Sequence, residues 1–191
     1  GVDAKDVDLV IFATSSPDDL FGDACLVARS VGAVNAVAFD LTAACSGFLF
    51  GASATGTMRR LTKTPCRCRA RPTSPSPTPN PGVNTASQFL HNGAYKTALV
   101  IGGDALSRWV DWSDRNTCVL FGDGAGAVVL QATEEGEAPG VLGYEMHSNG
   151  AGRTDLNLGY DGEAKELASI ATVTGGSYKP IAMNGKEVYK F

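Results

Sequence analysis

The sequence predicts an α/β fold in which a parallel sheet is layered with helices. Two short runs near the beginning of the chain have the length and composition of buried strands. Each is followed by a segment with apolar residues at helical spacing, and this alternation is typical of a parallel sheet. A chain of 191 residues, 43% of them hydrophobic, is also long enough to bury a sizeable core.

The first strand is predicted over residues 8–14, where Leu-Val-Ile-Phe-Ala forms an uninterrupted apolar run. Ser15-Ser16-Pro17-Asp18-Asp19 predicts a turn, because Pro and Asp favour turn geometries. Apolar residues at helical spacing then predict a helix over residues 23–31, with Gly32 as its stop. β-Branched and aromatic residues with small residues between them predict a second strand over residues 35–41.

Cys45 lies where this second strand gives way to a helix. The residues around it are small and allow tight packing: Ala43, Ala44, Ser46 and Gly47. Backbone N–H groups at the start of a helix carry partial positive charge and favour a thiolate, so Cys45 is a candidate nucleophile. The alternative is a small buried cysteine that fills the corner between strand and helix.

The helix that begins after Cys45 is interrupted by residues 52–82. This segment holds six of the nine prolines of the chain, at positions 65, 72, 75, 77, 79 and 81. It also holds basic residues and no acidic ones, shows no periodicity, and is predicted to be disordered. Joining Gly51 directly to Val83 restores helical spacing through Phe48, Ala86 and Leu90.

Foreign sequence within the chain, such as a retained intron read in frame, is the favoured interpretation of residues 52–82. Two functional interpretations remain open. The segment could be a basic, proline-rich tail that binds a partner, or Cys66 and Cys68 could form half of a metal site.

Beyond the insert, a third strand is predicted over residues 96–104, followed by a polar and aromatic stretch with two tryptophans. Residues 117–121 and 127–131 are predicted as two strands joined by a tight glycine-rich turn over residues 122–126. A nucleotide-binding glycine loop would have to open a helix, whereas Val-Val-Leu here predicts a strand.

The remaining residues predict less regular structure. A further strand is expected over residues 140–147, and residues 148–182 are glycine-rich and irregular. A helix is expected to begin at residue 183.

Four segments resemble, in the same order, the β-ketoacyl-acyl carrier protein synthase III family of the thiolase-like superfamily. They are Ala13-Thr14-Ser15-Ser16-Pro17-Asp18-Asp19-Leu20-Phe21, Thr42-Ala43-Ala44-Cys45-Ser46-Gly47-Phe48, Ser107-Arg108-Trp109-Val110-Asp111-Trp112-Ser113-Asp114-Arg115 and Phe121-Gly122-Asp123-Gly124-Ala125-Gly126-Ala127. The resemblance implies a thiolase-like α-β-α-β-α fold built from two similar halves. We therefore expect residues 1–51 with 83–132 to form the N-terminal half and residues 133–191 to begin a truncated second half, so that the chain is a fragment.

The resemblance also implies an acyltransferase that initiates fatty acid synthesis. Cys45 would accept the acyl group of an acyl-CoA primer and would pass it to decarboxylated malonyl-acyl carrier protein. The expected primer is acetyl-CoA. Acyl-CoA and the acyl carrier protein would be substrates and partners, with neither cofactor nor metal required. Family members are homodimers, and Phe21 matches the residue that reaches into the partner's acyl pocket.

Further site residues follow from the same resemblance. Arg115 matches the arginine that holds the CoA nucleotide, although a local ion pair with Asp111 or Asp114 is the alternative. Gly185 and Tyr189 match positions along the pantetheine tunnel. The family's His-Gln-Ala-Asn and Gly-Asn-Thr segments, which carry its catalytic histidine and asparagine, do not occur in this sequence. The chain alone is therefore expected to be inactive.

The two histidines of the chain, His91 and His147, are interpreted as a surface residue and a strand-end residue. A type III polyketide synthase-like or thiolase-like enzyme, or a non-enzymatic mis-spliced product, remains an alternative function. The net charge of −4 favours neither nucleic acid nor an acidic membrane surface, and five irregularly spaced cysteines indicate a reducing compartment. The expected location is the plastid stroma for a eukaryotic source, with bacterial cytoplasm as the alternative.

Overall fold

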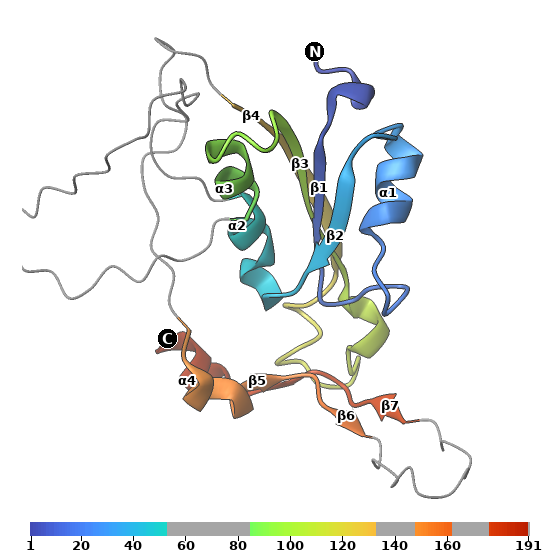
Figure 1. The fold of residues 1–191 in the computed structure, drawn as a ribbon. Coiled ribbons are helices and arrows are strands. Elements are labelled where there is room, and N and C mark those ends of the chain that lie inside the picture. Colours follow the sequence, from blue (N-terminus) through green and yellow to red (C-terminus); the bar gives the residue numbers. More distant parts are fainter. Residues whose placement is uncertain (53–84, 133–147, 162–175, 191) are drawn as a thin grey trace, which may run out of the picture. The chain divides into compact units, whose positions relative to one another are not determined.

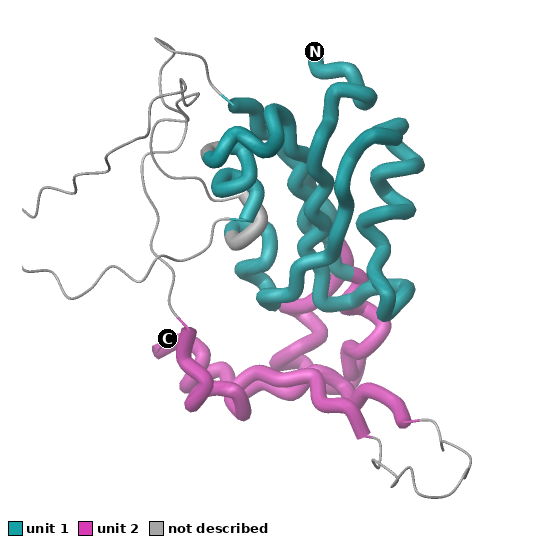
Figure 2. The backbone as a smooth tube through the Cα atoms, in the orientation of Figure 1, with its two compact units in different colours: residues 1–104, 125–146 teal, residues 105–124, 147–191 magenta. Residues whose placement is uncertain are grey.

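The computed structural model describes residues 1–52, 85–132, 148–161 and 176–190. The chain divides into two compact units, which Figure 2 shows in different colours. Unit 1 comprises Gly1–Asp104 and Ala125–Met146, and unit 2 comprises Ala105–Gly124 and His147–Phe191. In the described part of the chain, no helix is long and apolar enough to cross a membrane.

Unit 1 is built on a four-stranded sheet with the strand order β2-β1-β3-β4 (Figure 1). The strands are β1 (Leu9–Ala13), β2 (Val37–Leu41), β3 (Thr97–Ala105) and β4 (Asp123–Gln131). Strand β1 runs parallel to both of its neighbours, and its last residue, Ala13, lies opposite Leu41 and Gly102. The predicted parallel sheet is confirmed, and the carboxyl ends of three strands meet at one edge.

Helices cover both faces of this sheet (Figure 1). Helix α1 (Ala24–Val31) lies on one face, and helices α2 (Gly47–Ala52) and α3 (Thr85–His91) lie on the other. Successive side chains of a strand point to opposite faces, so each face of β1 contributes to its own cluster. Leu9 and Ile11 pack with the residues of α3, whereas Val10 packs with Ala28 of α1. Burial on both sides explains the uninterrupted apolar run in the sequence.

Helix α1 begins and ends close to its predicted limits. Gly32, the predicted stop, has a φ of +86°, and its N–H donates to the carbonyl oxygens of Ala28 and Arg29. Glycine adopts this left-handed conformation without the steric cost that a Cβ imposes. The predicted helix stop is confirmed.

The helical spacing predicted across residues 52–82 agrees with the structure on either side of that segment. Phe48 of α2 packs against the same cluster that contains the buried side chains of Ala86 and Leu90 of α3. The predicted insert itself, with Cys66 and Cys68, lies outside the described residues apart from Ala52. The strand predicted over residues 140–147 also lies outside them.

The prediction of a glycine-rich turn over residues 122–126 is wrong. Strand β4 runs without interruption from Asp123 to Gln131, and residues 117–121 form turns in which the N–H groups of Leu120 and Phe121 donate to the Thr117 carbonyl. Asp114 accepts hydrogen bonds from Asn116 and Thr117 immediately before these turns. Such local side-chain bonds compete with strand pairing, which explains why the apolar run 117–121 is not a strand.

In its described residues, unit 2 contains short elements only. They are the 3-10 helices η3 (Leu106–Trp109) and η4 (Gly150–Thr154), the strand pairs β5 (Leu156–Asn157) with β8 (Ala182–Met183) and β6 (Tyr160–Asp161) with β7 (Ser177–Tyr178), and helix α4 (Gly185–Tyr189). The ring of Tyr178 lies edge-on to both Trp109 and Tyr160, at centroid distances of 5.7 and 5.3 Å. The irregular stretch predicted over residues 148–182 thus contains two-residue strand pairs, and the predicted terminal helix is confirmed as α4.

Gly102 allows α2 to approach β3, and its replacement tests this packing. A Cβ at position 102 would lie 2.9 Å from the Cβ of Phe48, so Gly102→Ala should lower the free energy of unfolding by about 1–3 kcal/mol. Gly126→Ala is the matched control, because a Cβ on this strand glycine would meet nothing within 4 Å. Urea denaturation followed by circular dichroism measures both variants. Equal stability of the two would contradict the packing.

Candidate active site

Cys45 lies in the middle of a single 3-10 turn, η2 (Ala44–Ser46), between the end of β2 and the beginning of α2. This position is at the carboxyl edge of the parallel strands, where functional residues of layered α/β proteins commonly gather. The side chain of Cys45 is exposed. The alternative interpretation of a buried cysteine filling the corner is therefore wrong.

Ala44, the residue before Cys45, has a strained backbone. Its φ is +46°, and it is the one non-glycine residue with a positive φ in the described part of the chain. A left-handed conformation costs an L-residue about 1–3 kcal/mol and persists only where the surroundings impose it. The backbone of the turn is closed on both sides, since Ser46 N–H donates to the Ala43 carbonyl and Gly47 N–H to the Ala44 carbonyl.

The turn is also packed closely onto the sheet. A Cβ at Gly47 would lie 3.2 Å from the Cβ of Ala13, the last residue of β1. The next residue, Phe48, covers Gly102 of β3. The close packing predicted from the sequence is therefore confirmed at Gly47, which is buried, whereas Ala44 and Ser46 are exposed.

A hydrogen-bond network joins the ends of the three parallel strands beside this turn. Thr42, which follows β2, donates from its hydroxyl to the carbonyl oxygen of Thr14, which follows β1, at 2.9 Å. The Thr14 hydroxyl donates to a carboxylate oxygen of Asp104 on β3 at 3.3 Å. The same oxygen accepts from Ser15 N–H at 2.7 Å and from the Ser16 hydroxyl at 3.0 Å.

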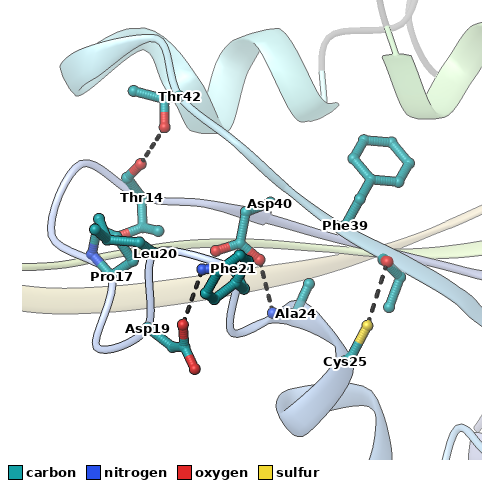
Figure 3. A pocket seen from close by; sticks show the side chains of 12 residues that line it. Thr14, Pro17, Asp19, Leu20, Phe21, Ala24, Cys25, Phe39, Asp40 and Thr42 are labelled. Atoms are coloured by element: carbon teal, nitrogen blue, oxygen red, sulfur yellow. Dashed lines mark hydrogen bonds between the residues drawn. The ribbon is translucent and has the colours of Figure 1, made fainter. Parts of the chain in front are cut away.

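Aspartates also hold the loop that follows Ser16 and carries Phe21. Asp40 of β2 accepts from the N–H groups of Asp23 and Ala24 at 3.0 and 2.7 Å and so caps the first turn of α1. Asp19 accepts from the N–H of Phe21 at 2.9 Å (Figure 3). The loop nevertheless leaves Leu20 and Phe21 85% and 102% exposed. Such a fixed apolar tip suits a residue that meets a partner chain, and this role of Phe21 stays a prediction.

A pocket of about 380 Å³ lies between this loop, α1 and β2 (Figure 3). Phe21, Phe39, Asp40 and Cys25 are among its lining residues, and Cys45 is not. The thiol of Cys25 is exposed and donates to the Ala38 carbonyl oxygen at 3.5 Å. Exposure alone therefore does not distinguish Cys45 from Cys25.

The other predicted site residues lie in unit 2. Arg115 is exposed and forms no ion pair among the described residues. No ion pair joins Arg115 to Asp111 or Asp114 among the described residues, so that alternative is wrong. The two carboxylates accept hydrogen bonds from Ser113, Asn116 and Thr117.

Gly185 and Tyr189 are the first and last residues of α4, and Tyr189 is almost fully exposed. The structure thus places Cys45 and Phe21 in unit 1 and Arg115, Gly185 and Tyr189 in unit 2. His91 is the last residue of α3, and His147 lies outside the described residues.

Sequence reasoning missed Asp104, Asp40, Thr14 and Thr42. The available signal was their position, since each is a polar residue at or just beyond the carboxyl end of a predicted strand. No local pattern indicates which of them bond to each other, because the Thr14–Asp104 bond joins residues 90 positions apart.

A family model and two relatives of known description are similar in sequence to this chain. A sequence model described as 3-oxoacyl-[acyl-carrier-protein (ACP)] synthase III matches residues 80–150, a range that begins within the last three residues of the predicted insert. The β-ketoacyl-[acyl-carrier-protein] synthase III of Acaryochloris marina is 48% identical over 190 residues, covering 100% of this chain and 47% of that protein. The relative from Synechococcus elongatus is 49% identical over 191 residues, with coverages of 100% and 47%. The resemblance to the synthase III family is confirmed.

Solved synthase III structures agree in fold. The enzyme of Aquifex aeolicus superposes with a TM-score of 0.68 at 30% identity, covering 99% of this chain and 46% of that one. The Pseudomonas aeruginosa enzyme gives 0.64 at 30% identity, with coverages of 96% and 44%. The predicted thiolase-like α/β class is therefore confirmed. The chain spans about half the length of the synthase III relatives that it matches.

Replacing Ala44 by glycine tests the strain beside Cys45. Ala44→Gly should raise the free energy of unfolding by about 0.5–1 kcal/mol, because glycine adopts a positive φ without a Cβ clash. The matched control is Ala43→Gly, at a φ of −149°, which should lower it through added freedom of the unfolded chain. Urea denaturation measures both. A loss of stability in Ala44→Gly as large as that in Ala43→Gly would contradict the strain.

Acid should loosen the segment that carries Arg115. Hydrogen bonds from Asn116 N–H and the Thr117 hydroxyl lower the pKa of Asp114 below its ordinary value of 3.8, and those from Ser107 lower the pKa of Asp123. A lowered folded-state pKa adds stability above pH 3.8 that is lost as the pH falls further. Fluorescence of Trp109 and Trp112, the two tryptophans of the chain, should report this change. Asp114→Asn should weaken the acid dependence, and an unchanged profile would contradict it.

Proposed function

We propose that the protein of which this chain is a part initiates fatty acid synthesis by joining an acyl-CoA primer to malonyl-acyl carrier protein. Cys45 supports the proposal most directly. It is an exposed thiol in a strained turn at the carboxyl edge of a parallel sheet, within the segment that resembles the family nucleophile. The predicted primer is acetyl-CoA.

In the first step the Cys45 thiolate attacks the carbonyl carbon of the acyl-CoA. A new carbon–sulfur bond forms, and the CoA thiolate leaves with the displaced electron pair. The backbone N–H of Cys45 is proposed to donate to the oxyanion that develops during this attack. Arg115, exposed and without an ion pair among the described residues, is available to stack on the adenine and pair with phosphate.

In the second step malonyl-acyl carrier protein loses carbon dioxide, and the resulting carbanion attacks the Cys45 thioester. The 3-ketoacyl-acyl carrier protein is released together with the Cys45 thiolate. The family histidine and asparagine that would stabilise the carbanion are absent from this sequence. Each such donor contributes on the order of a hundredfold to a thousandfold in rate, so the 191-residue chain alone is expected to form no detectable condensation product, which leaves acyl transfer to Cys45 as the step that can be tested on it.

The proposal requires two kinds of partner and no cofactor, since acyl-CoA and acyl carrier protein act as substrate and carrier. A second copy of the chain is proposed to receive the exposed tip at Phe21, as in the homodimers of the family. Gly185 and Tyr189 would contact the pantetheine arm. The division into residues 1–51 with 83–132 and residues 133–191 stays a prediction, as does a location in the plastid stroma or the bacterial cytoplasm.

Transfer from acetyl-CoA tests the first step. The 191-residue chain incubated with acetyl-CoA should carry acetyl on Cys45, as detected by peptide mass spectrometry under acidic conditions that preserve thioesters. Cys25 is the internal control, because its thiol is also exposed and lies in the same unit. Cys45→Ala should abolish the modification. Acetylation of Cys25 in preference to Cys45 would overturn the assignment of the nucleophile.

A further inference from the structure

Three neighbouring strands of unit 1 each contribute one polar residue at the same edge of the sheet. Thr42 follows β2, Thr14 follows β1, and Asp104 lies near the end of β3. Ala13 lies opposite both Leu41 and Gly102, so the in-register parallel pairing brings these polar residues together. We call Asp104, Thr14, Ser16 and Thr42 the strand-end network.

The strand-end network is anchored in the protein interior. Thr14 and Ser16 are only 4% and 6% exposed, and polar groups at such depth are stable only when hydrogen-bonded. The Thr14 hydroxyl donates to Asp104 and accepts from Ser16 N–H at 3.1 Å. Thr14 is held a second time through its backbone, since its N–H donates to the Leu41 carbonyl at 3.1 Å. Thr42 therefore bonds to a fixed carbonyl oxygen.

Thr42 transmits this anchoring to the turn that carries Cys45. It precedes Ala44 by two residues, and Ala44 holds the strained φ of +46°. A strained residue keeps its conformation only when the flanking chain is fixed on both sides. Gly47, packed on Ala13, fixes one side, and the bond from the Thr42 hydroxyl to Thr14 fixes the other (Figure 3).

We propose that Thr42 and Asp104 are positioning residues that hold the Cys45 thiol in its reactive orientation. Asp104 fixes Thr14, Thr14 fixes Thr42, and Thr42 fixes the strained turn. The same carboxylate binds Ser15 N–H and the Ser16 hydroxyl, so one network sets both the nucleophile turn and the start of the loop that presents Phe21. The inference rests on the proposed role of Cys45.

Site-resolved alkylation of the 191-residue chain tests the inference. The free cysteines of the described residues are the exposed Cys45 and Cys25 and the half-buried Cys118. They are labelled with limiting iodoacetamide, and the rate at each is measured by peptide mass spectrometry. Thr42→Val removes the hydroxyl while keeping the β-branched shape, and Thr42→Ser retains the hydroxyl. Asp104→Asn weakens the anchor through a neutral acceptor. Labelling in urea supplies the rate of each thiol in the unfolded chain.

Thr42→Val should slow alkylation of Cys45 by about threefold to tenfold, the size expected when one hydrogen bond is lost. The rates at Cys25 and Cys118 should not change, and Thr42→Ser should restore the Cys45 rate. Asp104→Asn should slow Cys45 in the same direction by a smaller factor. An unchanged Cys45 rate, a parallel rise at all three cysteines, or failure of Thr42→Ser to restore the rate would each overturn the inference.

This test is independent of the one for the proposed function. Acetylation of Cys45 with no effect of Thr42→Val on alkylation would overturn the positioning role and leave the proposed nucleophile in place. If acetyl-CoA does not acetylate Cys45 in the unsubstituted chain, but Thr42→Val still slows alkylation of Cys45, the proposed function is overturned and the positioning role stays in place.

Discussion

The parallel pairing of β1 with both β2 and β3 is the constraint on which the candidate site depends. Because Ala13 lies opposite Leu41 and Gly102, the segments that leave these three strands start side by side. The segment after β1 carries Phe21, the segment after β2 carries Cys45, and Asp104 lies near the end of β3 itself. A shift of β1 by one residue would turn its side chains to the opposite faces and separate Thr14 from its two partners. The geometry of the candidate site therefore depends on the register of β1 with β2 and β3.

Close packing at this edge of the sheet explains why glycine occupies positions 47 and 102. Helix α2 approaches the sheet so nearly that a Cβ on Gly47 or Gly102 would meet Ala13 or Phe48. Glycine at both positions permits this contact, and the chain passes from β2 into α2 through Ala44, whose φ is +46°. The chain thus exposes the Cys45 thiol through backbone geometry, with no charged side chain in the turn itself.

Much of unit 1 could be predicted from the sequence because its signals are local. The apolar run of β1, the helical spacing of α1 and the glycine stop at Gly32 each lie within a few residues. The bonds of Asp104 and the continuity of β4 could not be predicted. Asp104 bonds to residues 88–90 positions away, and the glycines of β4 look like a turn until pairing with β3 makes them a strand.

Helices α2 and α3 are stabilised by packing against the strands of the sheet. In the described part of the chain, α2 and α3 comprise six and seven residues, fewer than the roughly 12–15 residues at which an isolated helix becomes marginally stable in water. Phe48, Ala86 and Leu90 instead pack against Leu9, Ile11 and Val100 in one cluster. Because the strands supply this packing, the geometry at Cys45 depends on the sheet edge and its strand-end network rather than on a long uninterrupted helix.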